Sequence, residues 1–529
     1  MLDSSTILTL VVVVLVVHYV LADRYPRPQN LPPGPRPLPI LGNAHQMPLE
    51  YAEETFAKWS SQYGDVVFVK VFHRPVLILN SARAVRELME KRSMKYSGRP
   101  PSVLLSELSG WGDVLGVMQM GERLRKQRRW LHSVLFAEGA LDKFRAVQRT
   151  EVNVLLVSLL RKPDDYAAHL HRLTASLMME SIYGHTVASD EDEYLHYAEA
   201  ALKGTTEVAS PGAAIVDILP FLRHIPSWMP GAGFKREAAE VKVSIEEAHV
   251  RPYEMVERAM AAGDDKPSLV RNLIDECAGR GNLAEERRDI MSAGAVSYIA
   301  GVDTTKTVLL NFILCAVLFP EAYSKAQEEM GRVVGTARLP DLNDRDTLPY
   351  LESFLLEVYR WHCPVPLGVP HAASEDDEFR GWYIPKGCMV IPNLWLLTLD
   401  EELYPEPESF RPERFLGLSA EDAERLDPRN IVFGHGRRIC PGRRFADVSI
   451  WLAVANIVAA FDVRKAQDAD GKDITPPLAF VPGSVSHPRP FKCSIAARNV
   501  AMELLADLNP CAVYGARPYQ LPFFDEVLT

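Results

Sequence analysis

The chain has 529 residues, of which 47% are hydrophobic and 24% are charged, so its composition is that of an ordinary globular protein with a large core. The formal net charge of −11, with no basic tail to offset it, argues against nucleic acid as a partner. The seven cysteines are an odd number in so long a chain, and no N-x-[ST] sequon occurs, so the sequence favours a domain that folds in a reducing compartment.

Residues 1–23 are predicted to form a transmembrane anchor. The run from Ile7 to Ala22 is almost entirely apolar, and its length is close to the lower limit of roughly 17–25 residues for a membrane-spanning helix. A cleaved signal peptide is the alternative, but the residues before this run include Asp3 and no lysine or arginine. The first arginines follow the run, which predicts that the rest of the chain lies in the cytosol.

Residues 24–40 are predicted to form a proline-rich hinge. Within them, Leu31–Pro37 reads LPPGPRP, and such a sequence favours a stiff, extended backbone over a flexible linker. Residues 41–500 then form the predicted main domain. The last segment, residues 501–529, is an extension whose sequence indicates no role.

The main domain is predicted to begin with a helix and two strands. The helix covers Leu49–Tyr63, and the strands cover Val66–Val71 and Val76–Leu79, which are rich in valine and leucine. The next stretch, Ser97–Trp111, mixes proline, serine, glycine and leucine, and this composition predicts a mobile loop.

A basic helix is predicted over Gly121–Phe136. Arg125 precedes Arg128 and Arg129 by three and four residues, so these arginines share one helix face. Such a run of charges is usually a solvated surface. Residues 140–290 then read as several amphipathic helices, in which the sequence indicates no chemistry.

A helix of roughly 35 residues is predicted over Ala284–Phe319, and it would be about 50 Å long. Its apolar middle contains AGVDTT at Ala300–Thr305. One interpretation is a packing notch of small residues, with threonines bonded back to the previous turn. Asp303 argues for a function instead, because a carboxylate in a buried helix is costly unless it has a partner or a task.

Two acid–base spacings follow. Glu357 and Arg360 are three residues apart and can pair on one helix face. An exposed pair of this kind contributes only about 0–1 kcal/mol, so the spacing alone means little. The segment RPERF, which contains Arg414, comes about fifty residues later.

A single cysteine between glycines is the most informative feature of the chain. Cys440 lies just before a predicted helix over Arg443–Phe461, and Pro441 suits a first helical position. The positive end of the helix dipole and the nearby arginines favour thiolate over thiol. A thiolate held in this way can be a nucleophile, a zinc ligand or an axial haem ligand.

Spacing argues against the first two of these roles. A phosphatase-type nucleophile would be followed six residues later by arginine, where this chain has Ala446. Structural zinc sites use paired spacings such as C-x-x-C, which does not occur. What remains is F-x-x-G-x-R-x-C-x-G, from Phe433 to Gly442, and this pattern resembles the haem-binding loop of the cytochrome P450 family. The A-G-x-D-T-T, E-x-x-R and P-E-R-F segments resemble the same family in the same order, so the resemblance covers about residues 30–500.

The resemblance implies a mainly α-helical fold with small β-sheets, the cytochrome P450 fold, behind a single N-terminal membrane anchor. It implies haem b as the prosthetic group and Cys440 as the axial ligand of its iron. The other residues that it places at the haem are Arg128, His371, Phe433, Arg438 and Gly442. Leu124 stands where the family usually has tryptophan, so Arg128 alone is carried over from the basic helix.

The resemblance also implies roles for the remaining motifs. Gly301 would leave room for dioxygen, and Asp303 and Thr304 would relay protons during oxygen activation. The implied structural triad consists of Glu357, Arg360 and Arg414.

The implied function is that of a fungal microsomal monooxygenase of secondary metabolism or xenobiotic oxidation, which inserts one atom of O2 into a lipophilic small molecule. Electrons would come from NADPH through cytochrome P450 reductase, with cytochrome b5 as an optional partner, at the endoplasmic reticulum membrane. The chain has no G-x-G-x-x-G dinucleotide motif, which agrees with an external electron donor. Two alternatives stay open at this point: a reductase-independent haem-thiolate isomerase or dehydratase, and a non-catalytic haem-binding protein.

Overall fold

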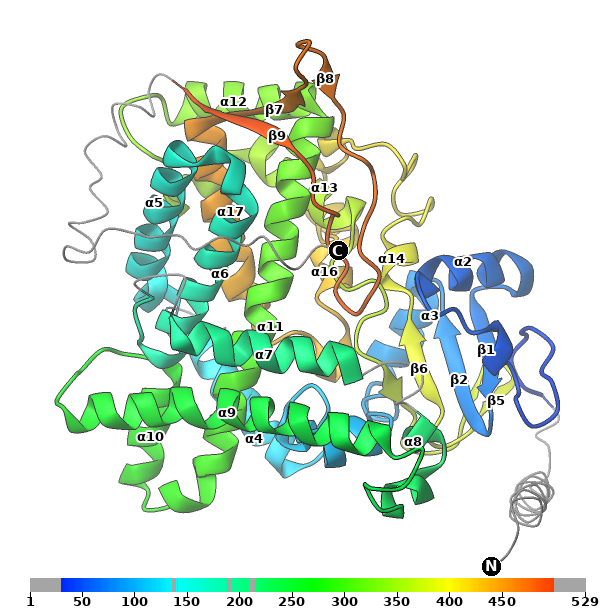
Figure 1. Cartoon of the computed structure of the whole chain (residues 1–529). Coiled ribbons are helices and arrows are strands. Elements are labelled where there is room, and N and C mark those ends of the chain that lie inside the picture. The colour runs from blue at the N-terminus through cyan, green and yellow to red at the C-terminus, as the bar shows by residue number, and fades with distance from the viewer. Residues whose placement is uncertain (1–29, 136–138, 140, 188–191, 209–214, 499–529) are drawn as a thin grey trace, which may run out of the picture. The chain divides into compact units, whose positions relative to one another are not determined.

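The computed structural model describes residues 30–135, 139, 141–187, 192–208 and 215–498 (Figure 1). The predicted anchor, the first residues of the hinge and the C-terminal extension therefore lie outside the described residues. The chain divides into two compact units. The first unit contains residues up to 100, 367–397 and 435–437, and the second contains 101–366, 398–434 and the chain from 438 onward.

The first unit is built on a four-stranded sheet in the order β1-β2-β6-β3. Its strands and helices are β1 Val66–Val71, β2 Arg74–Leu79, α2 Ala52–Tyr63, α3 Ala82–Val85, β3 His371–Ala372, β6 Met389–Pro392 and α14 Leu394–Leu397. A separate hairpin consists of β4 Asp377–Phe379 and β5 Trp382–Ile384. β1 and β2 are antiparallel, whereas β6 runs parallel to β2, so segments some three hundred residues apart lie side by side (Figure 1).

Helix α2 covers this sheet through an apolar core. Phe56 and Trp59 of α2 belong to the same buried cluster as Val67, Val69 and Ile78 of the two strands. The alternation of buried and half-exposed residues along β1 agrees with a sheet packed on one face. The predicted helix and strands of this region are thus confirmed, with α2 beginning three residues later than expected.

The described part of the predicted hinge lies against β1. Residues 30–37 are extended, and the carbonyl of Pro33 accepts a hydrogen bond of 2.8 Å from the N–H of Phe68. Gly34 is required at this contact, because a Cβ would overlap the carbonyl oxygen of Phe68. This segment is therefore bound along the sheet edge.

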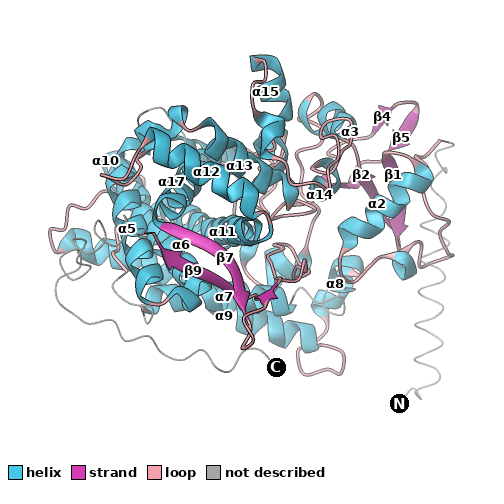
Figure 2. Ribbon diagram, turned by 90° about the horizontal axis from the view of Figure 1, so that it is seen from above, coloured by secondary structure: helices cyan, strands magenta, loops and turns pink. Residues whose placement is uncertain are grey.

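The second unit is mainly helical, which agrees with the predicted fold class. Its helices are α4 Glu122–Leu135, α5 Arg145–Arg161, α6 Tyr166–Tyr183, α7 Glu193–Val208, α8 Ile215–Ile218, α9 Gly233–Ala261, α10 Leu269–Gly279, α11 Leu283–Leu318, α12 Pro320–Val333, α13 Pro349–Trp361, α15 Ala420–Leu426, α16 Arg429–Val432 and α17 Arg443–Ala460. A small sheet in the order β8-β7-β9 is formed by β7 Phe461–Gln467, β8 Asp473–Ile474 and β9 Cys493–Ala497. Figure 2 shows β7 and β9 side by side.

Helix α11 is the central element of this unit. It has 36 residues, and α6, α7, α9, α10, α13 and α17 all pack against it. Among the residues that the structure describes, it is the helix long and apolar enough to cross a membrane, but 72% of its most apolar window is buried inside the protein. It is therefore a core helix, and its length agrees with the sequence prediction.

The stretch Ser97–Trp111, predicted as a loop, contains a short helix. Val103–Leu108 forms π-helical turns, and the hydroxyl of Ser102 caps them by accepting a hydrogen bond from the N–H of Leu105 at 2.9 Å. The amino-acid composition did not predict this short helix, because serine is common both at helix N-caps and in turns.

Candidate active site

Cys440 lies in a turn that leads into helix α17. The helix begins at Arg443 with Gly442 as its N-cap, so the expectation that Pro441 is the first helical residue was wrong. The N–H of Cys440 donates to the carbonyl of Phe433 at 2.9 Å. The N–H groups of Gly442 and Arg443 are aimed at the sulfur, so the start of the helix supplies donors to a thiolate.

In the protein without a bound metal, burial determines whether the Cys440 sulfur is a thiol or a thiolate. The guanidinium groups of Arg128 and Arg443 and the two N–H donors lower the pKa of Cys440, as the sequence predicted. Desolvation of the sulfur outweighs them and raises this pKa above its ordinary value, although the side chain keeps some accessible surface. A coordinated metal cation would remove the proton, because metal binding deprotonates a thiol ligand.

Arg128 reaches the cysteine turn from helix α4. Its Nη2 donates to the carbonyl of Ile439 at 2.9 Å, while its buried Nη1 has no hydrogen-bond partner in the described structure. Burial and the charge of Arg443 lower the pKa of Arg128. By contrast, Arg125 and Arg129 are exposed, so the predicted common face does not hold and Arg128 alone turns inward.

Arg438 is a second cation at this turn, and its side chain is buried. Its Nη2 donates to the carbonyl of Met118 at 2.7 Å and its Nη1 to that of Leu115 at 3.2 Å. Burial and the repulsion of Arg128 lower the pKa of Arg438 to about 10. Two like charges, one buried and one half-buried, that repel each other favour a neighbouring anion.

The two glycines beside the cysteine, Gly436 and Gly442, have different surroundings. Gly436 has φ +59° and belongs to the first unit, where a Cβ would overlap the carbonyl oxygen of Met89. It therefore allows close approach to another backbone segment. Gly442 faces open space, since no atom lies within 4 Å of the position that its Cβ would take. The ring of Phe433 lies 5.8 Å from that of Tyr359 of α13.

The polar segment of α11, Asp303–Lys306, contains a hydroxyl that is hydrogen-bonded to the preceding turn and an ion pair. Thr304 donates through Oγ1 to the carbonyl of Ala300 at 2.7 Å, as predicted. Ala300 is exposed although it lies in the middle of a core helix, so this face of α11 is open. Asp303 is paired with Lys306 at 2.8 Å, a partner that the sequence analysis missed although the i, i+3 spacing indicates it.

Gly301 was expected to leave room for dioxygen, but a side chain of α6 contacts it. A Cβ at Gly301 would lie 2.6 Å from the Sδ atom of Met178. The glycine is therefore explained by helix packing, and nothing in the described structure shows a separate oxygen pocket at this position.

The structure brings Glu357, Arg360 and Arg414 together. Arg360 donates to Glu357 through two nitrogens at 2.7 and 2.8 Å, and the Nε atom of Arg414 lies 3.0 Å from the same carboxylate. The side chains of Glu357 and Arg360 are fully buried. Arg360 also donates to the carbonyls of Thr398 and Ser409, so the cluster ties α13 to the segment around η9, Pro412–Phe415.

His371 belongs to the first unit, whereas Arg128 and Arg438 belong to the second. It is buried on β3, and its Nδ1 is 2.6 Å from the carbonyl oxygen of Tyr96. Within its unit, His371 is therefore fixed to the segment that precedes residue 100. Its predicted contact with the same cofactor as Arg128 stays a prediction.

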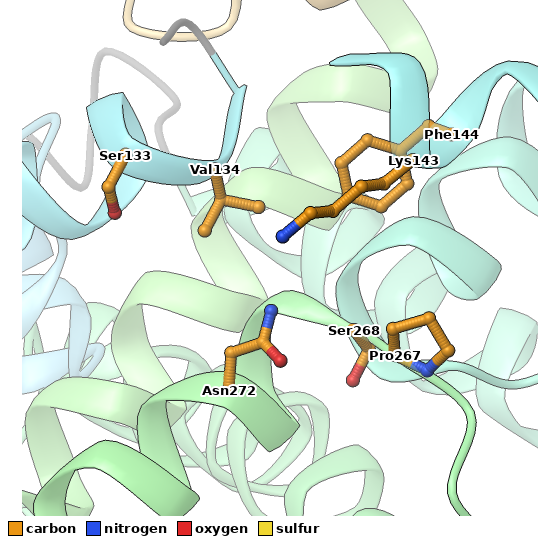
Figure 3. Close-up of a pocket in the computed structure, with 7 residues that line it drawn as sticks. All are labelled: Ser133, Val134, Lys143, Phe144, Pro267, Ser268 and Asn272. Carbon is orange, nitrogen blue, oxygen red and sulfur yellow. The ribbon is translucent and has the colours of Figure 1, made fainter. Parts of the chain in front are cut away.

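A surface pocket of the second unit is separate from all of these residues. It is lined by the end of α4, the turn at 141–144 and the start of α10 (Figure 3). The lining residues are Ser133, Val134, Lys143, Phe144, Pro267, Ser268 and Asn272. None of the predicted site residues contributes to it.

Comparison with known proteins agrees with the cysteine turn. The family model for cytochrome P450 matches residues 32–495. The chain belongs to the cytochrome P450 family. Cytochrome P450 monooxygenase 136 of Postia placenta is 43% identical over 93% of this chain and 93% of its own length. Cytochrome P450 monooxygenase claT of Ampulloclitocybe clavipes is 39% identical over 94% and 97%, and COX2 of Coprinopsis cinerea is 36% identical over 93% of each chain.

The residues of this P450 fit the haem of the family. A cysteine sulfur that receives two N–H donors suits an axial thiolate. The unpartnered Nη1 of Arg128 and the depressed pKa of Arg438 suit the carboxylates of the haem propionates. The donor set therefore matches an iron porphyrin with two acidic side chains.

Proposed function

We propose that this P450 is a microsomal monooxygenase in which Cys440 ligates the haem iron, and that it oxidises a lipophilic small molecule with electrons from NADPH. Membership of the family and relatives named monooxygenases support the reaction class. The observation that carries the residue assignment is the Cys440 turn, with its N–H donors and the half-buried Arg128 beside it. When bound, the haem supplies the redox chemistry of oxygen activation.

The protein holds the cofactor through charge and hydrogen bonds. Gly442 and Arg443 donate N–H groups to the sulfur and stabilise its negative charge. Arg128 and Arg438 bind the propionates, which relieves the repulsion between the two guanidinium groups. Phe433 packs beside the turn, with its ring 5.8 Å from that of Tyr359. The role of His371 at the haem rests on the family resemblance alone.

Asp303 and Thr304 handle protons on the open face of α11. The hydroxyl of Thr304 is held by the carbonyl of Ala300, so its oxygen can accept one proton while it gives another away. Asp303 supplies the titratable group one residue earlier. The exposed Ala300 keeps this face accessible to substrate and water.

Two surface features support the proposed partners and location. Arg125 and Arg129 of the second unit are exposed cations that suit an acidic electron donor such as cytochrome P450 reductase or cytochrome b5. In the second unit, the side chains of Phe221 and Trp228 are 60% and 77% exposed, which suits contact with lipid at the endoplasmic reticulum. The fungal relatives are consistent with secondary metabolism.

Replacing the cysteine tests the assignment. Cys440→Ser should abolish the carbon monoxide difference band of thiolate ligation, whereas Cys363→Ser and Cys388→Ser should keep it, because both of those thiols are buried elsewhere. Membranes with wild-type protein and reductase should convert a lipophilic substrate only when NADPH is present. A band retained in Cys440→Ser would overturn the ligand, and conversion without NADPH would favour an isomerase or dehydratase.

A further inference from the structure

The carboxylate of Asp303 is held by a cation on its own helix. The Nζ atom of Lys306 lies 2.8 Å from its Oδ1, and the two side chains are only 21% and 19% exposed. The backbone carbonyl of Asp303 accepts a hydrogen bond from the hydroxyl of Thr307 at 2.8 Å. The ion pair therefore fixes the direction of the carboxylate, one residue before the Thr304 hydroxyl.

A histidine from outside the helix, His487, is held close to α11. Its neighbour Ser486 lies 3.2 Å from Nε2 of His362, and the His362 carbonyl accepts a hydrogen bond of 3.2 Å from Asn311, five residues after Lys306. His487 belongs to a short hairpin in which Val481 donates to the His487 carbonyl and Arg489 to that of Ala479, each at 2.9 Å. The N–H of Ser486 donates to the carbonyl of Pro364 at 2.9 Å, so the hairpin is fastened beyond the end of α13. The position of His487 is thus set by backbone bonds.

The ring of His487 is poised to exchange protons. Its Nδ1 is buried and has no hydrogen-bond partner in the described structure. Burial lowers the pKa of His487, Lys306 lowers it further and Asp303 raises it. The imidazole is therefore neutral near pH 7, with one ring nitrogen left unpaired inside the protein.

Other titratable groups lie on the remaining sides. His362 lies close enough for His487 to lower its pKa, but it stays neutral near pH 7, because burial lowers this pKa to about 3. Toward α6 and α7, Lys306 acts on Glu199, which is bonded to His171 at 2.8 Å and lies 3.9 Å from His196. Glu199 and His171 are 47% and 33% exposed. Glu199 and His171 are thus more exposed to solvent than the Asp303–Lys306 ion pair, and we call them its solvated flank.

We propose that Lys306 and His487 complete the proton relay of this enzyme: Lys306 positions the Asp303 carboxylate, and His487 carries protons from solvent to it. The inference rests on the proposed function of Asp303 and Thr304. The ring accepts a proton from water on one nitrogen and releases one from the other toward Asp303, so it ends neutral. Asp303 passes a proton to Thr304 and returns to its ion pair with Lys306.

Turnover tests the relay. His487→Gln removes the titratable ring at similar size and should lower product formed per NADPH consumed roughly tenfold, less than the 10²–10⁴-fold of a donor in direct contact. Lys306→Met should lower this ratio in the same direction, and Lys306→Arg should restore it because the cation returns. His171→Gln is the matched control on the solvated flank and should leave the ratio unchanged. An unchanged ratio in His487→Gln, or a loss in His171→Gln instead, would overturn the route.

A titration provides a readout that does not depend on activity. In the diamagnetic ferrous carbon monoxide form of full-length protein labelled at histidine ring carbons, the His487 resonance is identified by its loss in His487→Gln. Lys306→Met should raise the pKa of His487, because a repelling charge is removed, and Asp303→Asn should lower it. No shift in either variant would overturn the proposal. Failure of the wild type to form any NADPH-dependent product would instead count against the proposed function, and the titration would still decide whether the three groups interact.

Discussion

Met178 of α6 fills the space in which Gly301 of α11 would carry a side chain. A Cβ at Gly301 would lie 2.6 Å from Sδ, 2.9 Å from Cε and 3.1 Å from Cγ of Met178. The glycine therefore sets how closely these two helices pack, two residues before the Asp303 carboxylate. A stability experiment separates this packing role from a role in admitting oxygen.

Gly301→Ala should destabilise the protein by about 1 kcal/mol, the lower end of the cost of overpacking, because the thioether can move. The urea midpoint at constant slope measures this change. Gly331→Ala is the matched control, since Gly331 lies near the end of α12 with no atom within 4 Å of its Cβ position. It should stabilise the protein by about 0.5–1 kcal/mol through helix propensity.

The double variant with Met178→Ala tests whether contact with Met178 causes the destabilisation by Gly301→Ala. In a Met178→Ala background, Gly301→Ala should instead stabilise the protein by about 0.5–1 kcal/mol, because the clashing atoms are gone and the gain in helix propensity remains. If Gly301→Ala lowers turnover but leaves the urea midpoint unchanged in both backgrounds, the packing explanation is wrong and the space serves a reactant.

Motif and periodicity predicted the elements that carry the site, but not what those elements contact. The bounds of α11 and β1 follow from local pattern, and so does the bond from Thr304 to Ala300. The contact between Met178 and Gly301 joins residues over a hundred positions apart, and no local pattern contains it. The same holds for Arg128 and the Ile439 carbonyl, which are 311 residues apart.

The buried triad should be the most sensitive structural feature of the second unit. Arg360→Met leaves the fully buried Glu357 with one fewer cation, and breaking such a pair costs about 3–5 kcal/mol. The urea midpoint of the haem-loaded protein should therefore fall sharply. Arg411→Met is the control, because Arg411 and Glu406 are 47% and 70% exposed and such a pair contributes about 0–1 kcal/mol. Equal losses in the two variants would contradict the structural role of the triad.

The sequence identified this triad only through family resemblance, for a physical reason. A spacing of three residues, as between Glu357 and Arg360, occurs both in exposed ion pairs, which contribute little to stability, and in buried ones. Only burial distinguishes the two kinds of pair. The guanidinium of Arg360 lies over the ring of Tyr404 at 5.6 Å, and Tyr404 comes from a later segment with little regular structure. Hydrophobic periodicity gives no signal for such a segment.

His362 should make stability depend on pH. Its ring stacks on Phe480 at 3.4 Å, its Nε2 faces Ser486, and burial lowers its pKa to about 3. The unfolded chain binds a proton near pH 6.5 and the folded protein does not, so this contribution is complete above pH 6.5 and is lost as pH falls toward 3. Between pH 7.5 and 5.5 the loss should be about 1.4 kcal/mol.

Urea unfolding at the two pH values, in wild type and in His362→Gln, measures this contribution. Glutamine keeps a polar group near Ser486 but does not titrate, so the variant should lose about 1.4 kcal/mol less than wild type over this interval. His224→Gln is the control, because that histidine lies on an exposed turn of the second unit. The same pH dependence in all three proteins would mean that folding does not lower the pKa of His362.

Thr304 should determine how the electrons from NADPH are divided between product and hydrogen peroxide. Its hydroxyl is bonded to the Ala300 carbonyl at 2.7 Å on the open face of α11, and neither Thr304 nor Asp303 is an iron ligand in the proposed site. Thr304→Ala should therefore keep haem loading and substrate binding, while hydrogen peroxide replaces product. The loss of product per NADPH should fall within the roughly 10²–10⁴-fold range of a positioned proton donor. Thr304→Ser keeps the hydroxyl and should recover most of the coupling.

Ser297→Ala is the matched control for the helix itself. Ser297 makes the same kind of bond to the Ala293 carbonyl, also at 2.7 Å, two turns before Thr304. Losing that bond should leave the ratio of product to NADPH unchanged, because Ser297 lies outside the Asp303–Thr304 pair. Asp303→Asn should slow NADPH oxidation more than it diverts electrons to peroxide, since it removes the titratable group but keeps the shape. If Thr304→Ala retains the wild-type ratio, another group supplies the proton, and the role proposed for this segment of α11 must be withdrawn.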